Sequence, residues 1–176
     1  MALHSEKNTC ESGVIKKNWG GKISFALVYP NSYYVGMSNL GFQVVYRLLN
    51  NRSDVVAERV FLPEETELSL HLRAGRNLIS MESKVPLSRF DLIAFSISFE
   101  NDYPNILNLL DLARIPLRSA ERDESFPIVM AGGITTFLNP EPIADYIDFF
   151  LLGEAEENLN AFVDLFKDTA GKGSSK

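Results

Sequence analysis

ISFALVY (Ile23–Tyr29) is a nearly unbroken apolar and aromatic run that ends before Pro30. Strands in a parallel sheet covered by helices have this composition, because neither face of the sheet meets water. Residues 91–98 (DLIAFSIS) repeat the pattern, and 55–61, 128–131 and 149–152 are shorter or more β-branched versions of it. The sequence therefore predicts five strands that are buried on both faces.

Amphipathic segments separate these runs. In residues 39–50, Leu40, Val44 and Leu48 share one stripe, as helical spacing requires. A second helix is predicted to open at Asn101-Asp102, and a final helix carries apolar residues at i, i+3, i+4 and i+7. We expect a loop over 30–38, a short helix near 143–146, and a short helix with an extra strand or hairpin within 63–90.

Alternating strands and helices predict an α/β domain of three layers, with a parallel sheet and right-handed crossovers. Five such units suit the flavodoxin-like (Rossmann-like) strand order 2-1-3-4-5. We expect a polar N-terminal lead-in over 1–20, one domain over 21–170, and a tail over 171–176 that is disordered or a chain end.

The composition excludes several classes of function. The chain has 176 residues, 17 Lys and Arg, and 23 Asp and Glu, and its net charge of −6 argues against a DNA-binding protein. Its one cysteine, Cys10, and two histidines, His4 and His71, make an internal disulfide impossible and a protein-only transition-metal site improbable. No run approaches the ~20 apolar residues of a membrane span, and no secretory signal is present. We predict a cytoplasmic protein.

Unusual residues follow the predicted strands, at the edge of the sheet where ligands bind in this architecture. The small, hydroxylated or polar side chains there would let a flat cofactor or a nucleotide tail approach the backbone. The candidate cofactor-binding residues are Asn31, Tyr33 and Gly36 after the first strand, Ser96 and Ser98 at the third, Gly132 and Gly133 at the fourth, and Gly153 and Glu154 at the fifth.

Each of these residues also has a purely structural explanation. The glycine pair could supply a positive φ for a tight turn. The two serines, predicted on one side of their strand, could be ordinary residues at the edge of the core. Tyr33 and Tyr34 could be packing or lid aromatics, and Glu154, with Glu156 and Glu157, could simply favour the positive end of a helix dipole. No catalytic set is visible, since no histidine lies near a nucleophile and no phosphate-binding glycine loop occurs.

Two other flavodoxin-like classes fit poorly. A phospho-receiver needs paired acids after strand one, an aspartate ending strand three and a lysine after strand five, where this chain has Asn31, Ser98 and Glu154. A flavin phosphate loop needs several Ser, Thr and Gly residues directly after strand one, and the tyrosine-rich segment here does not match.

Two motifs resemble the N-terminal region of large radical S-adenosylmethionine (SAM) proteins. The first is YYVGMSNLGF, starting at Tyr33; the second is AGG (from Ala131) with NPEP (from Asn139) and LGEAEE (from Leu152). Phe90-Asp91-Leu92-Ile93 and Ile115-Pro116-Leu117 add to the likeness, which spans roughly 23–157. The combination of both motifs is specific, whereas either alone is weak.

This resemblance implies a cobalamin-binding-like domain ahead of an iron–sulfur barrel in the same parent chain. The parent would bind a [4Fe–4S] cluster through C-x3-C-x2-C, cleave SAM, and act as an oxidoreductase or transferase. This chain has no such cysteine motif. We therefore expect an N-terminal domain without radical chemistry of its own, whose partner is that barrel.

Cobalamin is the cofactor that the resemblance implies for this domain. The strongest cobalamin signature is D-x-H-x-x-G, and the equivalent stretch here has Asn31, Tyr33 and Gly36. A neutral phenol is a poor cobalt ligand compared with imidazole. The alternative is a non-catalytic interaction module that docks on the barrel, closing its mouth or gripping a protein or RNA substrate.

Overall fold

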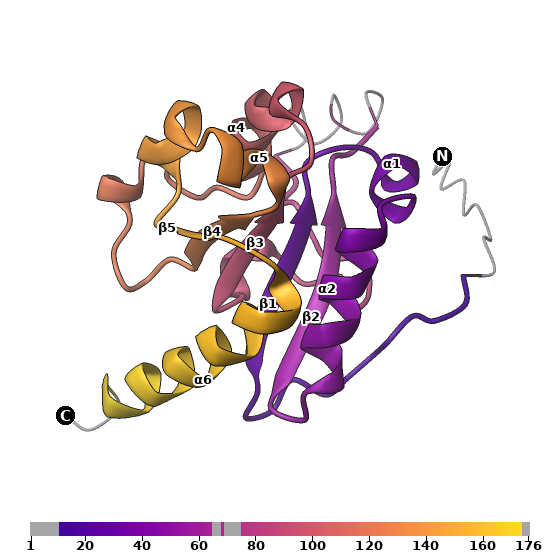
Figure 1. Ribbon diagram of the computed structural model, residues 1–176, viewed down its shortest axis with the longest axis vertical. Coiled ribbons are helices and arrows are strands. Elements are labelled where there is room, and N and C mark those ends of the chain that lie inside the picture. Colours follow the sequence, from indigo (N-terminus) through magenta and orange to yellow (C-terminus); the bar gives the residue numbers. More distant parts are fainter. Residues whose placement is uncertain (1–10, 65–67, 69–74, 174–176) are drawn as a thin grey trace.

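The computed structural model describes residues 11–64, 68 and 75–173, apart from the side chains from residue 170 onward. Five parallel strands form one sheet in the order β2-β1-β3-β4-β5 (Figure 1). The fold class and strand order predicted from the sequence are confirmed. The strands are β1 (Ile23–Tyr29), β2 (Val55–Phe61), β3 (Leu92–Ser96), β4 (Ile128–Gly132) and β5 (Phe149–Leu151).

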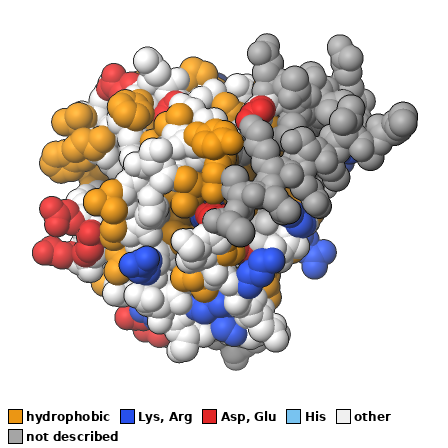
Figure 2. Space-filling view, turned by 90° about the vertical axis from the view of Figure 1, so that its right-hand side faces the viewer, with side chains coloured by type: hydrophobic (Ala, Val, Ile, Leu, Met, Phe, Trp, Pro, Cys, Tyr) orange, Lys and Arg blue, Asp and Glu red, His pale blue; other side chains and the backbone are white. Residues whose placement is uncertain are grey.

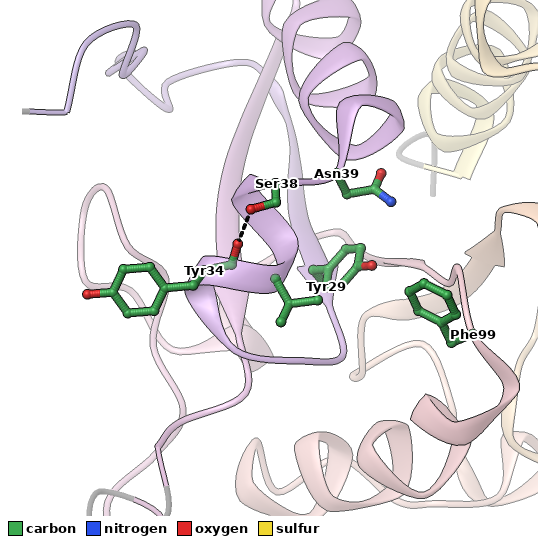
Figure 3. A pocket seen from close by; sticks show the side chains of 6 residues that line it. Tyr29, Tyr34, Ser38, Asn39 and Phe99 are labelled. Carbon is green, nitrogen blue, oxygen red and sulfur yellow. Dashed lines mark hydrogen bonds between the residues drawn. The ribbon is translucent and has the colours of Figure 1, made fainter.

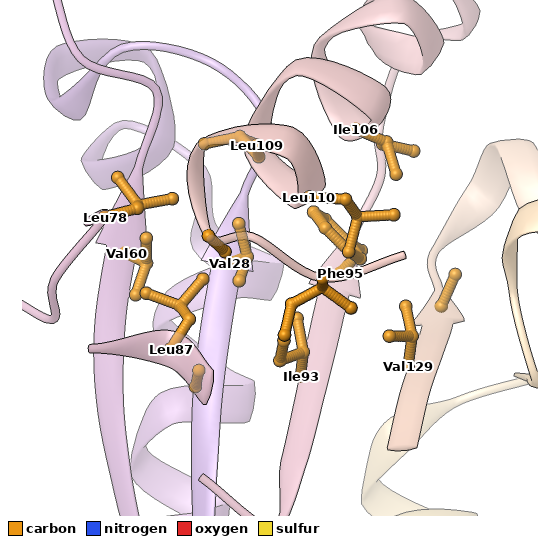
Figure 4. Close-up of a cluster of buried hydrophobic side chains, with 14 of the residues drawn as sticks. Val28, Val60, Leu78, Leu87, Ile93, Phe95, Ile106, Leu109, Leu110 and Val129 are labelled. Atoms are coloured by element: carbon orange, nitrogen blue, oxygen red, sulfur yellow. The ribbon is translucent and has the colours of Figure 1, made fainter. Parts of the chain in front are cut away.

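Helices cover both faces of the sheet, and alternate residues of each strand supply the two cores. On one face, Phe25 and Leu27 of β1 pack with α2 (Leu40–Asn51) and α6 (Ala155–Gly173). On the other, Ala26 and Val28 pack with α4 (Tyr103–Leu112) (Figure 4). This burial on both sides explains why the strands are continuous apolar runs.

Short elements differ from the expectations. The predicted loop after β1 contains a one-turn helix, α1 (Tyr33–Met37), and a second short helix, α5 (Ile134–Leu138), follows β4 without having been predicted. The short helix predicted within 63–90 falls in part outside the described residues, of which Leu68 is helical. The predicted strand or hairpin corresponds to the antiparallel bridge Ile79↔Pro86, which the 3₁₀ turn Leu87–Arg89 follows. Other 3₁₀ turns are Glu100–Asp102, Ser119–Glu121 and Glu141–Tyr146. Helix α6 continues to Gly173, past the start of the predicted tail.

The described part of the N-terminal lead-in, residues 11–20, is held against the domain. Lys17 Nζ donates hydrogen bonds to the carbonyl oxygens of Asn50, Arg52 and Val55. Trp19 Nε1 donates to the buried Glu58 carboxylate at 2.9 Å. These bonds fix the segment beside the end of α2 and the start of β2. The outer edge of β2 is satisfied mainly by other groups: the Asn50 side chain bonds Ala57, and the Met81 amide and the Glu82 carboxylate bond the backbone of Arg59.

The helices bear on the prediction that no segment crosses a membrane. Among the described residues, none of the helices combines the length and the apolar character that a membrane span requires.

Candidate functional site

A cleft opens at the carboxyl edge of the sheet, where the strand order reverses between β1 and β3. It has a volume of about 380 Å³ and lies between α2 and α6. The lining residues come from β1, from the ends of β3, β4 and β5, and from both helices. Ligands bind at such a topological switch point in doubly wound α/β folds.

Apolar side chains form most of this cleft. Phe25 and Leu27 of β1 and Met130 of β4 lie at its floor, and α2 and α6 contribute its walls. The wall residues are Val44, Val45 and Leu49 of α2 and Leu159 of α6. Among the residues that line the cleft there is no Lys or Arg, and the one carboxylate is the exposed Glu156.

Polar groups lie at the mouth of the cleft. Ser96 and Ser98 both line it, as expected for residues two apart in an extended segment. Ser98 Oγ accepts a hydrogen bond of 3.0 Å from Asn39 Nδ2. Asn39 also caps α2, because its Oδ1 accepts from the amide of Phe42 at 2.9 Å.

The glycine pair lines the cleft for a reason in the backbone. Gly133 has φ of +115°, and a Cβ there would collide with the carbonyl oxygen of Ile97. A Cβ on Gly132 would stand 3.3 Å from the Leu151 oxygen. The structural explanation, a positive φ in a tight turn, therefore holds for Gly133, and this turn leaves the cleft without a side chain at that point.

Two more glycines have different surroundings. Gly153 (φ +95°) lines the cleft, and a Cβ there would approach the side chain of Asn158. Gly36 is buried away from the cleft, and a Cβ there would stand 2.5 Å from the Phe61 ring and 3.0 Å from that of Tyr29. Gly36 therefore permits close packing of α1 on the core.

Three other predicted residues lie outside the cleft. Asn31 donates through Nδ2 to Asp102 Oδ1 at 2.8 Å. Tyr33 packs edge-on against Phe61, with ring centroids 5.3 Å apart. The pKa of its phenol is raised, mainly by burial and to a smaller extent by the nearby Glu11 carboxylate. Glu154 is exposed, and its backbone oxygen accepts hydrogen bonds from the amides of Glu157 and Asn158 in the first turn of α6.

A shallow basin of about 480 Å³ adjoins the cleft on the rim; we name it the rim basin. It is lined by Tyr29, Tyr34, Val35, Ser38, Asn39 and Phe99 (Figure 3). Asn39 therefore lines both cavities. Asn39 begins the predicted helix over 39–50 and belongs to the motif YYVGMSNLGF, but it was not among the predicted site residues.

Large apolar side chains are exposed on segments that follow directly from strand ends. Figure 2 shows hydrophobic side chains in the upper half of one face, toward the edge where the strands end, and Lys and Arg in the lower half. We use the name edge patch for the eight exposed apolar residues on these segments: Tyr34, Val35, Leu40, Phe99, Ile134, Phe137, Leu138 and Leu152. Exposed apolar side chains gathered in this way are typical of interaction surfaces.

Neither cavity is lined by a cluster of metal-binding side chains. Within the described part of the chain, no group of three or more His, Cys, Asp or Glu side chains could hold a metal ion. His4, Cys10 and His71 lie outside the described residues. The cleft therefore offers shape, apolar contact and a few hydrogen bonds.

The strand order and the cleft at its switch point place the chain in the class of flavodoxin-like α/β domains. Residues 41–176 match the family model "Radical SAM proteins, N-terminal". The chain belongs to this family of radical SAM N-terminal regions, which confirms that part of the resemblance.

One curated relative extends the comparison. An uncharacterized protein of Methanocaldococcus jannaschii is 26% identical over 131 residues, which are 74% of this chain and 24% of that protein. The chain thus spans about a quarter of that relative's length. No solved structure matches the chain.

Proposed function

We propose that this chain is the accessory domain of a radical SAM protein and holds cobalamin by the cofactor's nucleotide tail. The observation that carries the proposal is the apolar cleft of about 380 Å³ at the switch point, lined by Ser96, Ser98 and Gly132. Reductive cleavage of SAM at a [4Fe–4S] cluster is proposed for the barrel of the parent protein, and none of its steps is assigned to this chain.

The chemistry of the cleft suits a nucleotide tail that ends in benzimidazole. Such a base is flat and apolar, and the apolar floor at Leu27 and Met130 would contact it. The hydroxyl groups of Ser96 and Ser98 would hydrogen-bond to the ribose or the phosphate. These residues are thus the ones that would hold the cofactor.

The charge of the cleft argues against more highly anionic cofactors. A dinucleotide carries a pyrophosphate, for which proteins commonly supply basic side chains or a glycine-rich turn at a helix N-terminus. The cleft has no Lys or Arg among its lining residues, its glycine pair Gly132-Gly133 precedes only the one-turn helix α5, and Glu156 adds a negative charge. A ligand with one phosphodiester and many neutral amides suits it better.

The binding mode does not use a cobalt–protein bond from Tyr33. That phenol packs on Phe61 beside Glu11 and lines neither cavity. When bound, cobalamin would supply a cobalt ion able to carry an alkyl group. The residues of this chain would bind and orient the tail and exclude water from it.

The test is titration of the purified chain with hydroxocobalamin, followed by visible absorbance and retention after gel filtration. Val44→Phe, which places a ring in the cleft, should weaken retention at least tenfold, whereas Arg47→Phe, with the same ring on an exposed position of α2, should not. Failure to retain the chromophore at ~100 µM, about −5.5 kcal/mol, would overturn the proposal.

A second candidate is the interaction module, and the edge patch favours it. Seven of its residues are at least half exposed, among them Leu40 (73%), Leu138 (69%) and Phe137 (63%). We propose that this patch docks on the barrel of the parent protein, because water-exposed apolar area of this kind is stabilised by burial. The charge-neutral double variant Phe137→Ser, Leu138→Ser should lose co-purification with the separately produced remainder of the parent. Retained co-purification would contradict docking through this patch.

A further inference from the structure

Asn39 lies at the boundary between the cleft and the rim basin and lines both. It begins α2, on the β1 side of the switch point, whereas Ser98 follows β3 on the other side. The hydrogen bond of 3.0 Å from Asn39 Nδ2 to Ser98 Oγ therefore spans the switch point. A ligand that extends from the basin into the cleft must pass this bond.

The cap of α2 does not require this bond. Capping uses Oδ1, which accepts from the Phe42 amide at 2.9 Å, and Ser or Asp can replace Asn in that role. The Nδ2 group is free to change partners without loss of the cap. Ser98 Oγ can likewise accept from another donor, because a hydroxyl has both a donor and acceptors.

We infer that Asn39 is the positioning residue at the entrance of the cleft. In the free protein its Nδ2 donates a hydrogen bond to Ser98, and when the cleft fills it donates to the ligand instead. This inference rests on the proposed function for the identity of the ligand, and its first test does not use that ligand. Exchange of partners keeps both polar groups satisfied in each state, which avoids the cost of an unpaired group at the mouth.

The first test measures how readily the cleft opens. In a Cys10→Ser background, Ser96→Cys places a single thiol in the cleft, at a residue that does not line the rim basin. Its rate of reaction with fluorescein maleimide reports access for a large molecule. Methyl methanethiosulfonate, a small reagent, reports access that does not depend on the bond.

Variants of the bond then separate its role from that of the cap. Asn39→Ser keeps a helix cap, but its side chain is too short to reach Ser98. Ser98→Ala removes the acceptor, while Asn39 still caps α2. Both variants should raise the rate of reaction with fluorescein maleimide about two- to tenfold, which is the effect of losing one neutral hydrogen bond. Asn39→Asp should react at the original rate, because Ser98 can donate to the carboxylate. Equal rates throughout, or an increase in Asn39→Ser alone, would overturn the inference.

The second test uses hydroxocobalamin. Asn39→Ser should speed both its association and its dissociation. Gln43→Ala, which loses only a hydrogen bond to Met37 O and lines neither cavity, should change neither. Failure of every variant and of the original chain to bind would overturn the proposed function, while the maleimide result would still decide whether the bond closes the entrance.

Discussion

Asp102 Oδ1 accepts a hydrogen bond of 2.8 Å from Asn31 Nδ2, while Asp102 Oδ2 is buried without a hydrogen-bond partner. The residue is only 4% exposed. Burial raises the pKa of the carboxyl group, and the bond from Asn31 lowers it by less. The pair joins the segment after β1 to the start of α4, beside the switch point.

The first prediction concerns the pH dependence of stability at Asp102. A folded-state pKa above the unfolded one means that its contribution is fully present below pH ~4 and is lost as the pH rises through the folded value. Relative to Asp102→Asn, the original chain should therefore become less stable between pH 4 and 7. Urea unfolding of both proteins across that range measures the difference between their free energies of unfolding. A difference that does not change with pH would contradict a raised pKa of Asp102.

The second prediction concerns Tyr46 at alkaline pH. Its hydroxyl bonds the Glu82 carboxylate and the backbone of Ile15, and burial raises its pKa to about 12. The unfolded state then loses this proton first, so stability should fall between pH 10 and 12. Tyr46→Phe should cost about 1–3 kcal/mol at pH 7 and should flatten that alkaline loss. Denaturant unfolding of both proteins at pH 7, 9 and 11 is the measurement. If the free energy of unfolding falls equally with pH in both proteins, Tyr46 is not the source of the alkaline loss.

The third prediction concerns the buried ion pair of β2. Arg59 Nε donates to Glu82 Oε1 at 2.7 Å, and both side chains are at most 3% exposed; Glu11 also pairs with Arg59. Removing one partner leaves a buried charge uncompensated, so Arg59→Met should destabilise the fold by about 3–5 kcal/mol.

A double variant checks this explanation. Replacing both charges, with Arg59→Met and Glu82→Leu, should recover part of the loss, because the remaining charge no longer has to be desolvated. Chemical denaturation of the single and double variants gives the coupling energy. Losses that simply add would show that the two side chains act independently.

The fourth prediction separates the two adjacent glycines at the end of β4, Gly132 and Gly133. Gly133→Ala should destabilise the domain by about 1–3 kcal/mol or more, because it combines a positive φ with a collision against the Ile97 oxygen. Gly132→Ala, whose Cβ would meet Leu151 O at 3.3 Å without a positive φ, should cost less. Thermal unfolding ranks the two. A larger loss for Gly132→Ala would refute the reason given for the glycine pair.

Part of the candidate site was predictable because it follows strand ends. Parallel strands bring all their carboxyl ends to one edge, so Ser96, Ser98 and the glycine pair were expected together, and all of them line the cleft. Tyr33 was expected there too, but one turn of α1 directs its ring onto Phe61. The sequence predicted a loop in place of α1, and the direction of a side chain in a loop cannot be predicted.

The sequence by itself determined the sheet, because five apolar runs such as Ile23–Tyr29 can be buried only between two layers of helices. Its motifs also determined the family. Only the tertiary structure decided which side chains face the cleft, because Asn39, Val44 and Leu159 come from helices whose positions depend on packing across the sheet. Local spacing fixes the stripe that a helix buries, but the space left between two helices depends on how both rest on the strands beneath them.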